Sequence, residues 1–167
     1  QPRPRHTGAT LPPCHIWCMK SAFAQDNPPM FSLTVVDHVM IAHSFRGAEF
    51  GPAQRLHGAT FIVEAEFRAP KLDPLNLLVD IAAAKVELRH ILDGFDYRNL
   101  DAEPVFAGQN TTTEYLCLHI HRCLSAALAD GRLGAGGKAV TGLKVLLRES
   151  HIAWAAYEGA PGEEPAA

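Results

Sequence analysis

The sequence lacks the features that mark membrane-spanning and nucleic-acid-binding proteins. No apolar run in its 167 residues reaches the roughly 18–20 residues that a membrane-spanning helix needs. Its 15 lysine and arginine residues are outnumbered by 18 acidic ones, so the net charge is −3 with histidine neutral. Because no basic stripe is available to neutralise phosphates, neither a nucleic acid nor a membrane is an expected partner.

Cysteine is scarce and is not spaced for metal binding. The four cysteines are Cys14, Cys18, Cys117 and Cys123, and they form no CxxC pairs of the kind that zinc ribbons use. We interpret all four as free thiols of a protein in a reducing compartment. The expected location is therefore the cytoplasm.

The composition that remains is that of one globular domain with two atypical ends. The chain is 47% apolar and 20% charged, which is ordinary, and its length suffices for one hydrophobic core. Residues 1–29 carry proline and glycine without periodicity, so we predict a head that is disordered or derived from an expression vector, with a targeting segment as the alternative. Residues 159–167, "GAPGEEPAA", are predicted to be a disordered tail. The domain is then expected at 30–158.

Hydrophobic periodicity predicts six elements within this domain. Long runs of β-branched and alternating apolar residues are typical of strands, and apolar residues at intervals of three and four are typical of helices. The expected strands and helices, in chain order, are 31–43, 59–69, 80–92, 110–131, 140–150 and 152–158. This β-β-α-α-β-β order predicts an α+β fold with a four-stranded antiparallel sheet and two helices on one face. Its two open sheet edges favour oligomerisation through the sheet.

The ends of the two predicted helices carry recognisable caps. Asp80 is a suitable N-cap for the first helix, and Thr111 with Glu114 has the spacing of a capping box for the second. His119 and His121 lie two positions apart on the second helix and therefore point apart. We do not expect them to form a metal-binding pair.

Six short motifs follow one another between residues 31 and 158. They are "AH" at 42–43, "RLHG" at 55–58, "LLVDI" at 77–81, "FDYRNLD" at 95–101, "NTTTEY" at 110–115 and "LLRES" at 146–150. In this order they resemble the 6-pyruvoyltetrahydropterin synthase and 6-carboxytetrahydropterin synthase family. The resemblance implies the tunnelling fold, a homo-oligomer (a trimer or hexamer) built around a β-barrel, and a pterin substrate. It also implies one zinc ion held by three histidines, and a cysteine, an aspartate and a histidine that move protons.

The resemblance assigns roles to individual residues. Glu149 matches the glutamate that anchors the pterin ring, which suits a carboxylate because the 2-amino-pyrimidinone edge presents paired donors. Asp96 matches the catalytic aspartate, while His43 and His57 match two of the zinc histidines. The segment that lines the same pterin pocket is matched by Thr112, Thr113 and Glu114.

Three positions depart from the family pattern. Ala59 stands where the third zinc histidine belongs, Ala53 where the catalytic cysteine belongs, and Tyr97 where the catalytic histidine belongs. The zinc ligand set is therefore incomplete, and zinc binding needs another donor. Glu49 in the adjacent loop is one such donor, and a group from a neighbouring subunit is another.

Three functions remain open at this level. The first is an enzyme acting on the side chain of a dihydropterin in a lyase- or aldolase-like reaction, possible without metal by analogy with the dihydroneopterin aldolases of the same fold. In that reading Asp96, Tyr97 and His57 transfer protons while Glu149 anchors the ring. The second is a non-catalytic pterin- or purine-binding protein. The third is a zinc-dependent 6-pyruvoyl- or 6-carboxytetrahydropterin synthase with an unrecognised third ligand.

Structural roles compete with these functional ones. His57 follows a loop and can simply bond the backbone, and His43 can be a satisfied core histidine. Tyr97 can be a packing substitution. Glu149, near a strand end, can face solvent.

Overall fold

The computed structural model describes residues 29–165. The predicted head, residues 1–29, therefore lies outside the described residues except for its last position. The last two positions of the predicted tail, 159–167, lie outside them as well.

Five strands and two α-helices follow one another along the described chain. The strands are β1 (Phe31–His43), β2 (His57–Ala69), β3 (Arg98–Asn99), β4 (Gly142–Arg148) and β5 (Trp154–Gly159). The helices are α1 (Ile81–Asp93) and α2 (Thr113–Ala129). Short 3-10 helices lie in the connections, at Ala48–Gln54, Leu100–Ala102, Pro104–Phe106 and Ala135–Ala139. All six predicted elements are present.

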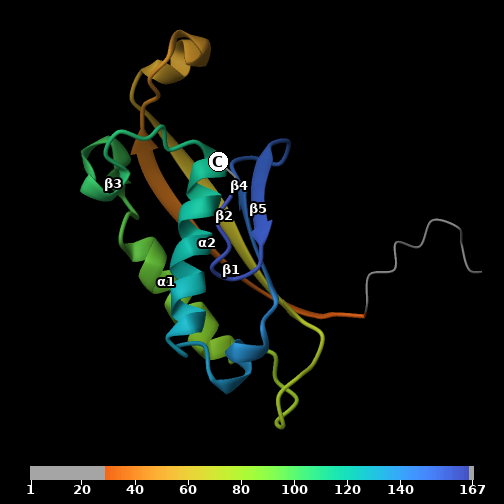
Figure 1. The fold of residues 1–167 in the computed structure, drawn as a ribbon. Coiled ribbons are helices and arrows are strands. Elements are labelled where there is room, and N and C mark those ends of the chain that lie inside the picture. Colours follow the sequence, from red (N-terminus) through yellow and green to blue (C-terminus); the bar gives the residue numbers. More distant parts are fainter. Residues whose placement is uncertain (1–28, 166–167) are drawn as a thin grey trace, which may run out of the picture.

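One twisted sheet carries both helices on one face (Figure 1). Its strand order is β3-β1-β2-β4-β5, and β1, β2, β4 and β5 pair antiparallel. The predicted α+β class is therefore confirmed. The prediction of four strands missed β3, which pairs parallel to β1 through Ile41 and Ala42 only. A two-residue strand is too short to leave a periodic signal in the sequence.

The two faces of the sheet differ in composition because side chains alternate along each strand. Odd-numbered residues of β1, β2 and β4 point toward the helices and form the core, as the alternation of 59–69 predicts. Even-numbered residues form the outer face, where apolar Ile62 lies exposed beside ion pairs such as Arg148 Nε to Glu64 Oε1 at 2.8 Å. Within the described part of the chain, no helix covers this outer face.

The helix N-termini are capped by side chains. Asp80 Oδ1 accepts from the backbone N–H groups of Ala82 and Ala83, as predicted. The cap of α2 is Thr112 and not Thr111, because Thr112 Oγ1 accepts from the N–H of Tyr115 at 3.3 Å. The predicted Thr111 cap is therefore wrong by one position, and the Thr111 side chain is directed to another partner.

The sequence predicted neither a membrane-spanning helix nor paired cysteines. None of the helices in the described part of the chain combines the length and the apolarity that crossing a bilayer requires. Cys117 and Cys123 are free thiols, as expected, while Cys14 and Cys18 lie outside the described residues.

His121 is buried near the middle of α2 and faces the edge strand β5. Its ring packs edge-on against the ring of Tyr157 in β5, with centroids 4.7 Å apart. Its Nε2 atom has no hydrogen-bond partner among residues 29–165. Burial lowers the pKa of His121, so the folded protein holds this imidazole neutral.

We expect the free energy of unfolding to fall as the pH drops below about 6.5, because the unfolded chain then binds a proton that folded His121 does not. The slope for one proton is at most about 1.4 kcal/mol per pH unit. His121→Leu should flatten the dependence, whereas His151→Ala, which removes an exposed histidine, should not. Urea unfolding at about pH 5 and pH 7.5 measures how the free energy of unfolding changes with pH. An equal change in His121→Leu and in the unmutated chain would contradict the assignment of this pH dependence to His121.

Candidate functional site

Two histidines stand side by side where β1 ends and β2 begins. The antiparallel register places His43 directly opposite His57, and both are odd-numbered residues on the helix-covered face. Their ring centroids are 4.6 Å apart at an interplanar angle of 55°. His43 is 2% exposed, while His57 is partly open to solvent. The structure therefore brings together the two histidines that the sequence analysis singled out.

Backbone carbonyl groups determine which nitrogen of each ring carries the proton. His43 Nδ1 lies 3.1 Å from the carbonyl oxygen of Thr111, and His57 Nδ1 lies 2.8 Å from that of Arg55. A carbonyl oxygen only accepts, so each Nδ1 donates its hydrogen and each Nε2 keeps its lone pair. His57 thus makes the backbone bond, and buried His43 has the hydrogen-bond partner, that their structural interpretations require. Each ring also retains a basic nitrogen.

Burial and the neighbouring ring keep His43 neutral. Desolvation lowers the pKa of His43 below its usual value, and the charge of His57 lowers it further. The carboxylates of Asp101 and Glu149 act in the opposite direction, which places both charges within electrostatic range of the ring. The His43 imidazole is therefore available as a base at neutral pH.

An aromatic cluster covers the two imidazoles. The ring of Phe45 stands edge-on to His43 at 4.6 Å and to His57 at 5.6 Å, and Phe50 packs behind it at 4.9 Å. The backbone N–H of Phe45 donates to the carbonyl of Ala53 at 3.1 Å, which folds the loop back over the strand ends. Sequence reasoning missed Phe45, because the loop between β1 and β2 has no periodicity that tells which side chain turns inward.

The histidine pair lacks a third protein ligand for a catalytic zinc. Such a site uses three protein ligands and one open position. Ala59, two residues after His57 on the same face, carries only a methyl group. Among residues 29–165, no three His, Cys, Asp or Glu side chains are grouped so that they could hold a metal ion. The described side chains therefore do not fit this zinc, and no step described below passes through it.

The carboxylate of Asp96 is engaged in holding α1 against β1. Its Oδ1 accepts from the backbone N–H of Met40 at 2.9 Å and from that of Tyr97 at 3.1 Å. Its Oδ2 accepts from Arg89 Nη2 at 2.9 Å, and Arg89 also donates to the carbonyl of His38 at 3.0 Å. Asp96 thus has a clear structural role, whatever part it takes in chemistry.

Tyr97 is held in an unusual backbone conformation at the edge of the sheet. Its φ of 55° lies in the left-handed region, which costs a bulky residue about 1–2 kcal/mol. Its N–H donates to the carbonyl of Met40 at 2.7 Å, and its side chain is 78% exposed. Met40 precedes His43 by three residues, or about 10 Å along the strand. The backbone of Tyr97 is therefore displaced along β1 from the histidine pair within one subunit.

The residues expected to bind the pterin ring lie at the same end of the sheet as the histidines. Glu149 follows the last residue of β4, is exposed, and donates its backbone N–H to the carbonyl of Ala153 at 3.2 Å. Thr112 caps α2, and Thr113 and Glu114 form its first turn. Thr111 lies directly before them and contacts His43. The N-terminus of α2 is thereby anchored beside the histidine pair.

Replacing Ala59 by histidine should complete a three-histidine zinc site, because position 59 faces the same side as His43 and His57. We expect Ala59→His to bind zinc at least about tenfold more tightly than the unmutated chain, as measured by competition with a chromogenic chelator. Thr60→His is the matched control, since position 60 points to the opposite face. Equal gains in both variants would contradict the placement of position 59.

Comparison with known proteins gives a consistent result. A family model described as 6-pyruvoyl tetrahydropterin synthase matches residues 32–160. No curated protein shows significant sequence similarity to the chain. The 6-pyruvoyl tetrahydropterin synthase of Caenorhabditis elegans is similar in structure, with a TM-score of 0.64 and 23% identity over 79% of this chain and 97% of that one.

Two further solved structures have the same fold. The 6-pyruvoyl tetrahydropterin synthase of Plasmodium vivax has a TM-score of 0.65 and 15% identity, and the match covers 79% of this chain and 99% of that one. The same enzyme has been solved with a glutamate, described as a catalytic residue, replaced by alanine or cysteine. The uncharacterised protein WS1659 of Wolinella succinogenes has a TM-score of 0.56 and 12% identity over 77% of this chain and 98% of that one.

Proposed function

The chain belongs to the 6-pyruvoyl tetrahydropterin synthase family, and we propose that it processes the side chain of a dihydropterin in a lyase- or aldolase-like reaction without a family-type zinc. One observation carries the proposal. His43 and His57 remain paired with both Nδ1 atoms bonded to backbone carbonyls, but the third ligand position is alanine. The pair then offers two basic Nε2 nitrogens rather than a metal centre.

Glu149 is proposed to anchor the pterin ring. It lies at the exposed end of β4, and its charge acts on His43, so a ring bound to it would extend toward the histidines. Its carboxylate can accept two hydrogen bonds from the amino-pyrimidinone edge. Thr112, Thr113 and Glu114 are proposed to line the same pocket, because they form the start of α2 beside Thr111.

The histidine pair is proposed to begin the chemistry. In a retro-aldol step a base removes the proton of a side-chain hydroxyl, the adjacent carbon–carbon bond breaks, and an acid protonates the carbon that stays with the ring. His57 is the more accessible of the two histidines and is proposed as the base, acting through Nε2. The buried neutral ring of His43 favours this role, since it adds no positive charge beside His57.

Tyr97 is proposed as the acid, with Asp96 as its partner. Asp96 accepts the backbone N–H of Tyr97 and so helps to hold its left-handed conformation. Because the phenol is exposed and the Tyr97 backbone is displaced along β1 from His43, we propose that it serves a pocket at a subunit boundary. The open outer face and edges of the sheet favour a homo-oligomer, a trimer or hexamer, that would form such boundaries.

Glu49 is a second candidate for the base. A glutamate is described as a catalytic residue in the Plasmodium vivax relative, and Glu49 lies in the loop between β1 and β2 that also carries Phe45. Its carboxylate is exposed and folds back over Gly47. We rank it behind His57, because no contact links Glu49 to the histidine pair in the described chain.

A non-catalytic pterin-binding protein is the alternative function. The observation that favours it is the engagement of Asp96, whose carboxylate already accepts from three donors. Such a carboxylate has few lone pairs left to accept a hydrogen bond or a proton from a substrate. In this alternative Glu149 still binds the ring, and no product forms.

Glu149→Gln should weaken binding of 7,8-dihydroneopterin by about ten- to a hundredfold. The substitution removes the negative charge, and the NH₂ group of the amide then faces an N–H donor of the pterin ring and cannot accept its hydrogen bond. Isothermal titration calorimetry measures the dissociation constant. His151→Ala alters the same loop two residues later and serves as the control, with affinity expected within about twofold. Unchanged affinity in Glu149→Gln would overturn the pocket, under both the catalytic and the binding function.

Turnover with a small panel, 7,8-dihydroneopterin and its triphosphate among them, should yield a product with an altered side chain. His57→Gln should lower kcat by about a hundredfold, and Tyr97→Phe by about tenfold, with KM nearly unchanged. Binding without product in the unmutated chain would favour the non-catalytic function. Stoichiometric zinc in protein purified without chelator, together with activity lost on chelation, would instead favour a zinc-dependent synthase.

A further inference from the structure

The residues on either side of Phe45 are both held by side chains from a distant segment. Ser44 precedes Phe45, and Asp101 accepts its backbone N–H at 3.1 Å and its hydroxyl at 2.7 Å. Arg46 follows Phe45, and its main chain is bound by Asn110. Asp101 and Asn110 both belong to the connection between α1 and α2. Side chains that are 57 and 64 positions away in sequence therefore fix the main chain around Phe45.

Asn110 binds Arg46 at two points. Its Oδ1 accepts from the backbone N–H of Arg46 at 2.8 Å, and its Nδ2 donates to the Arg46 carbonyl at 2.9 Å. The N–H group only donates and the carbonyl only accepts, so a single orientation of the amide satisfies both. Two residues of an antiparallel sheet exchange a pair of hydrogen bonds in the same way. The two bonds together fix both the position and the rotation of the main chain that follows Phe45.

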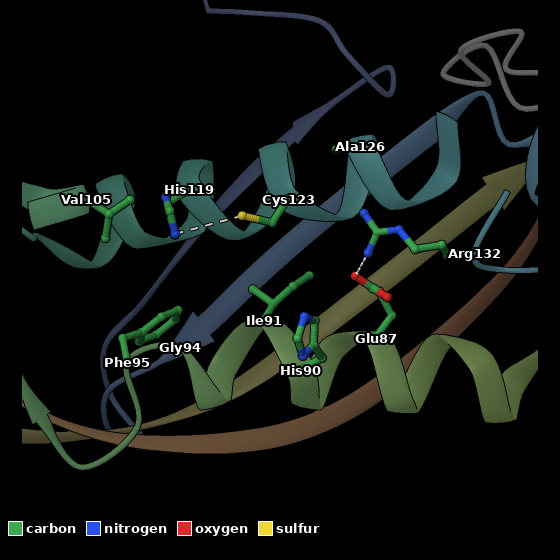
Figure 2. A pocket seen from close by; sticks show the side chains of 10 residues that line it. All are labelled: Glu87, His90, Ile91, Gly94, Phe95, Val105, His119, Cys123, Ala126 and Arg132. Carbon is green, nitrogen blue, oxygen red and sulfur yellow. Dashed lines mark hydrogen bonds and ion pairs between the residues drawn. The ribbon is translucent and has the colours of Figure 1, made fainter. Parts of the chain in front are cut away.

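The connection that carries Asn110 is itself packed against the helices. Phe106 is buried in this connection and stands edge-on to His119 of α2, with ring centroids 4.9 Å apart, and to Phe95 at 5.8 Å. Figure 2 shows Phe95 beside the end of α1 and His119 on α2, at the pocket between the two helices. Asn110 is thus supported by a segment that the core holds in place.

The imidazole of His57 depends on ring contacts for its orientation. Its Nδ1 bonds the carbonyl of Arg55 at 2.8 Å, but one hydrogen bond leaves the ring able to swing about it. The remaining contacts are with the rings of His43, at 4.6 Å between centroids, and of Phe45, at 5.6 Å. A catalytic group misplaced by about 1 Å can lose about a hundredfold in rate. The position of the Phe45 ring therefore matters for a base at His57.

Phe45 acts on His57 from outside the space that a substrate would enter. An open pocket of about 580 Å³ leads to His57, and its other lining residues are Pro52, Ala53, Arg55 and Leu56. Phe45 does not line this pocket, although its N–H donates to the carbonyl of Ala53 in the pocket wall. Its influence on a reaction would therefore pass through the His57 ring rather than through contact with the substrate.

We propose that Asn110 is a positioning residue of the histidine site. By fixing the main chain of Arg46 it keeps the Phe45 ring against His57, and Phe45 holds the imidazole in the orientation from which Nε2 takes the substrate proton. The consequence for turnover rests on the proposed function, because it needs His57 as the base. The orientation of the imidazole needs no substrate and can be measured separately.

Proton–carbon NMR of protein with isotope-labelled histidine measures this orientation. The shift of a ring proton of His57, identified by its loss in His57→Gln, depends on the nearby aromatic ring. We expect Asn110→Ala to move this signal in the same direction as Phe45→Ala does. Gln109→Ala, which alters the exposed neighbour of Asn110, should leave it in place. A His57 signal that stays unmoved in Phe45→Ala or Asn110→Ala, or that moves equally in Gln109→Ala, overturns the proposal.

Turnover of 7,8-dihydroneopterin tests the consequence for the reaction. Asn110→Ala should lower kcat about tenfold with KM nearly unchanged, and Gln109→Ala should leave both unchanged. The double variant Asn110→Ala/Phe45→Ala should be no slower than Phe45→Ala, because Asn110 acts through Phe45. Losses that add in the double variant would overturn this route.

Two further variants separate positioning from folding. Asn110→Asp keeps the acceptor for the N–H of Arg46 and loses only the donor, so it replaces Asn110→Ala in both measurements if that variant does not fold. Phe45→Tyr keeps the ring and should keep both the His57 signal and kcat. If the unmutated chain turns over no pterin, the proposed function fails, while the NMR result still decides whether Asn110 positions His57.

Discussion

The antiparallel register between β1 and β2 is the constraint on which the site depends. It places His43 opposite His57 and directs both toward the helices. Because side chains alternate along a strand, a slip of one residue would turn His57 to the outer face and bring Gly58 inward. The buried side chains that fix this register, Phe61 and Phe67 among them, lie further along the same face of β2. Core packing and site geometry are therefore settled by the same pairing.

Backbone groups from distant segments then give the paired histidines their chemical state. The carbonyls of Thr111 and Arg55 accept hydrogen bonds from the Nδ1 atoms. Thr111 directly precedes the N-cap of α2, so it links the start of this helix to the histidine site. Asp96 joins α1 to β1 through Arg89 and the N–H of Met40. In the proposed reaction Asp96 would serve both the fold and Tyr97, which explains why a carboxylate there can persist with or without catalysis.

Much of the fold could be predicted from the sequence, and part of the site could not. The alternation in β2 and the Asp80 cap are local patterns, and both were predicted correctly. The strand β3 was missed because two residues carry no periodicity, and the α2 cap was misplaced because Thr111 and Thr112 are equivalent by composition. Phe45 went unnoticed because its role depends on how a loop folds back, which the hydrogen bond to Ala53 decides.

The sequence by itself determined the class of fold, the family and the absence of histidine at position 59, since these follow from residue identity and order. Only the tertiary structure decided which nitrogen of each histidine is basic, that Asp96 is occupied by three donors, and that Asn110 binds the main chain beside Phe45. The physical reason is that hydrogen bonds, burial and pocket walls come from segments far apart in the chain. Their effects on protons and ligands arise only when those segments meet.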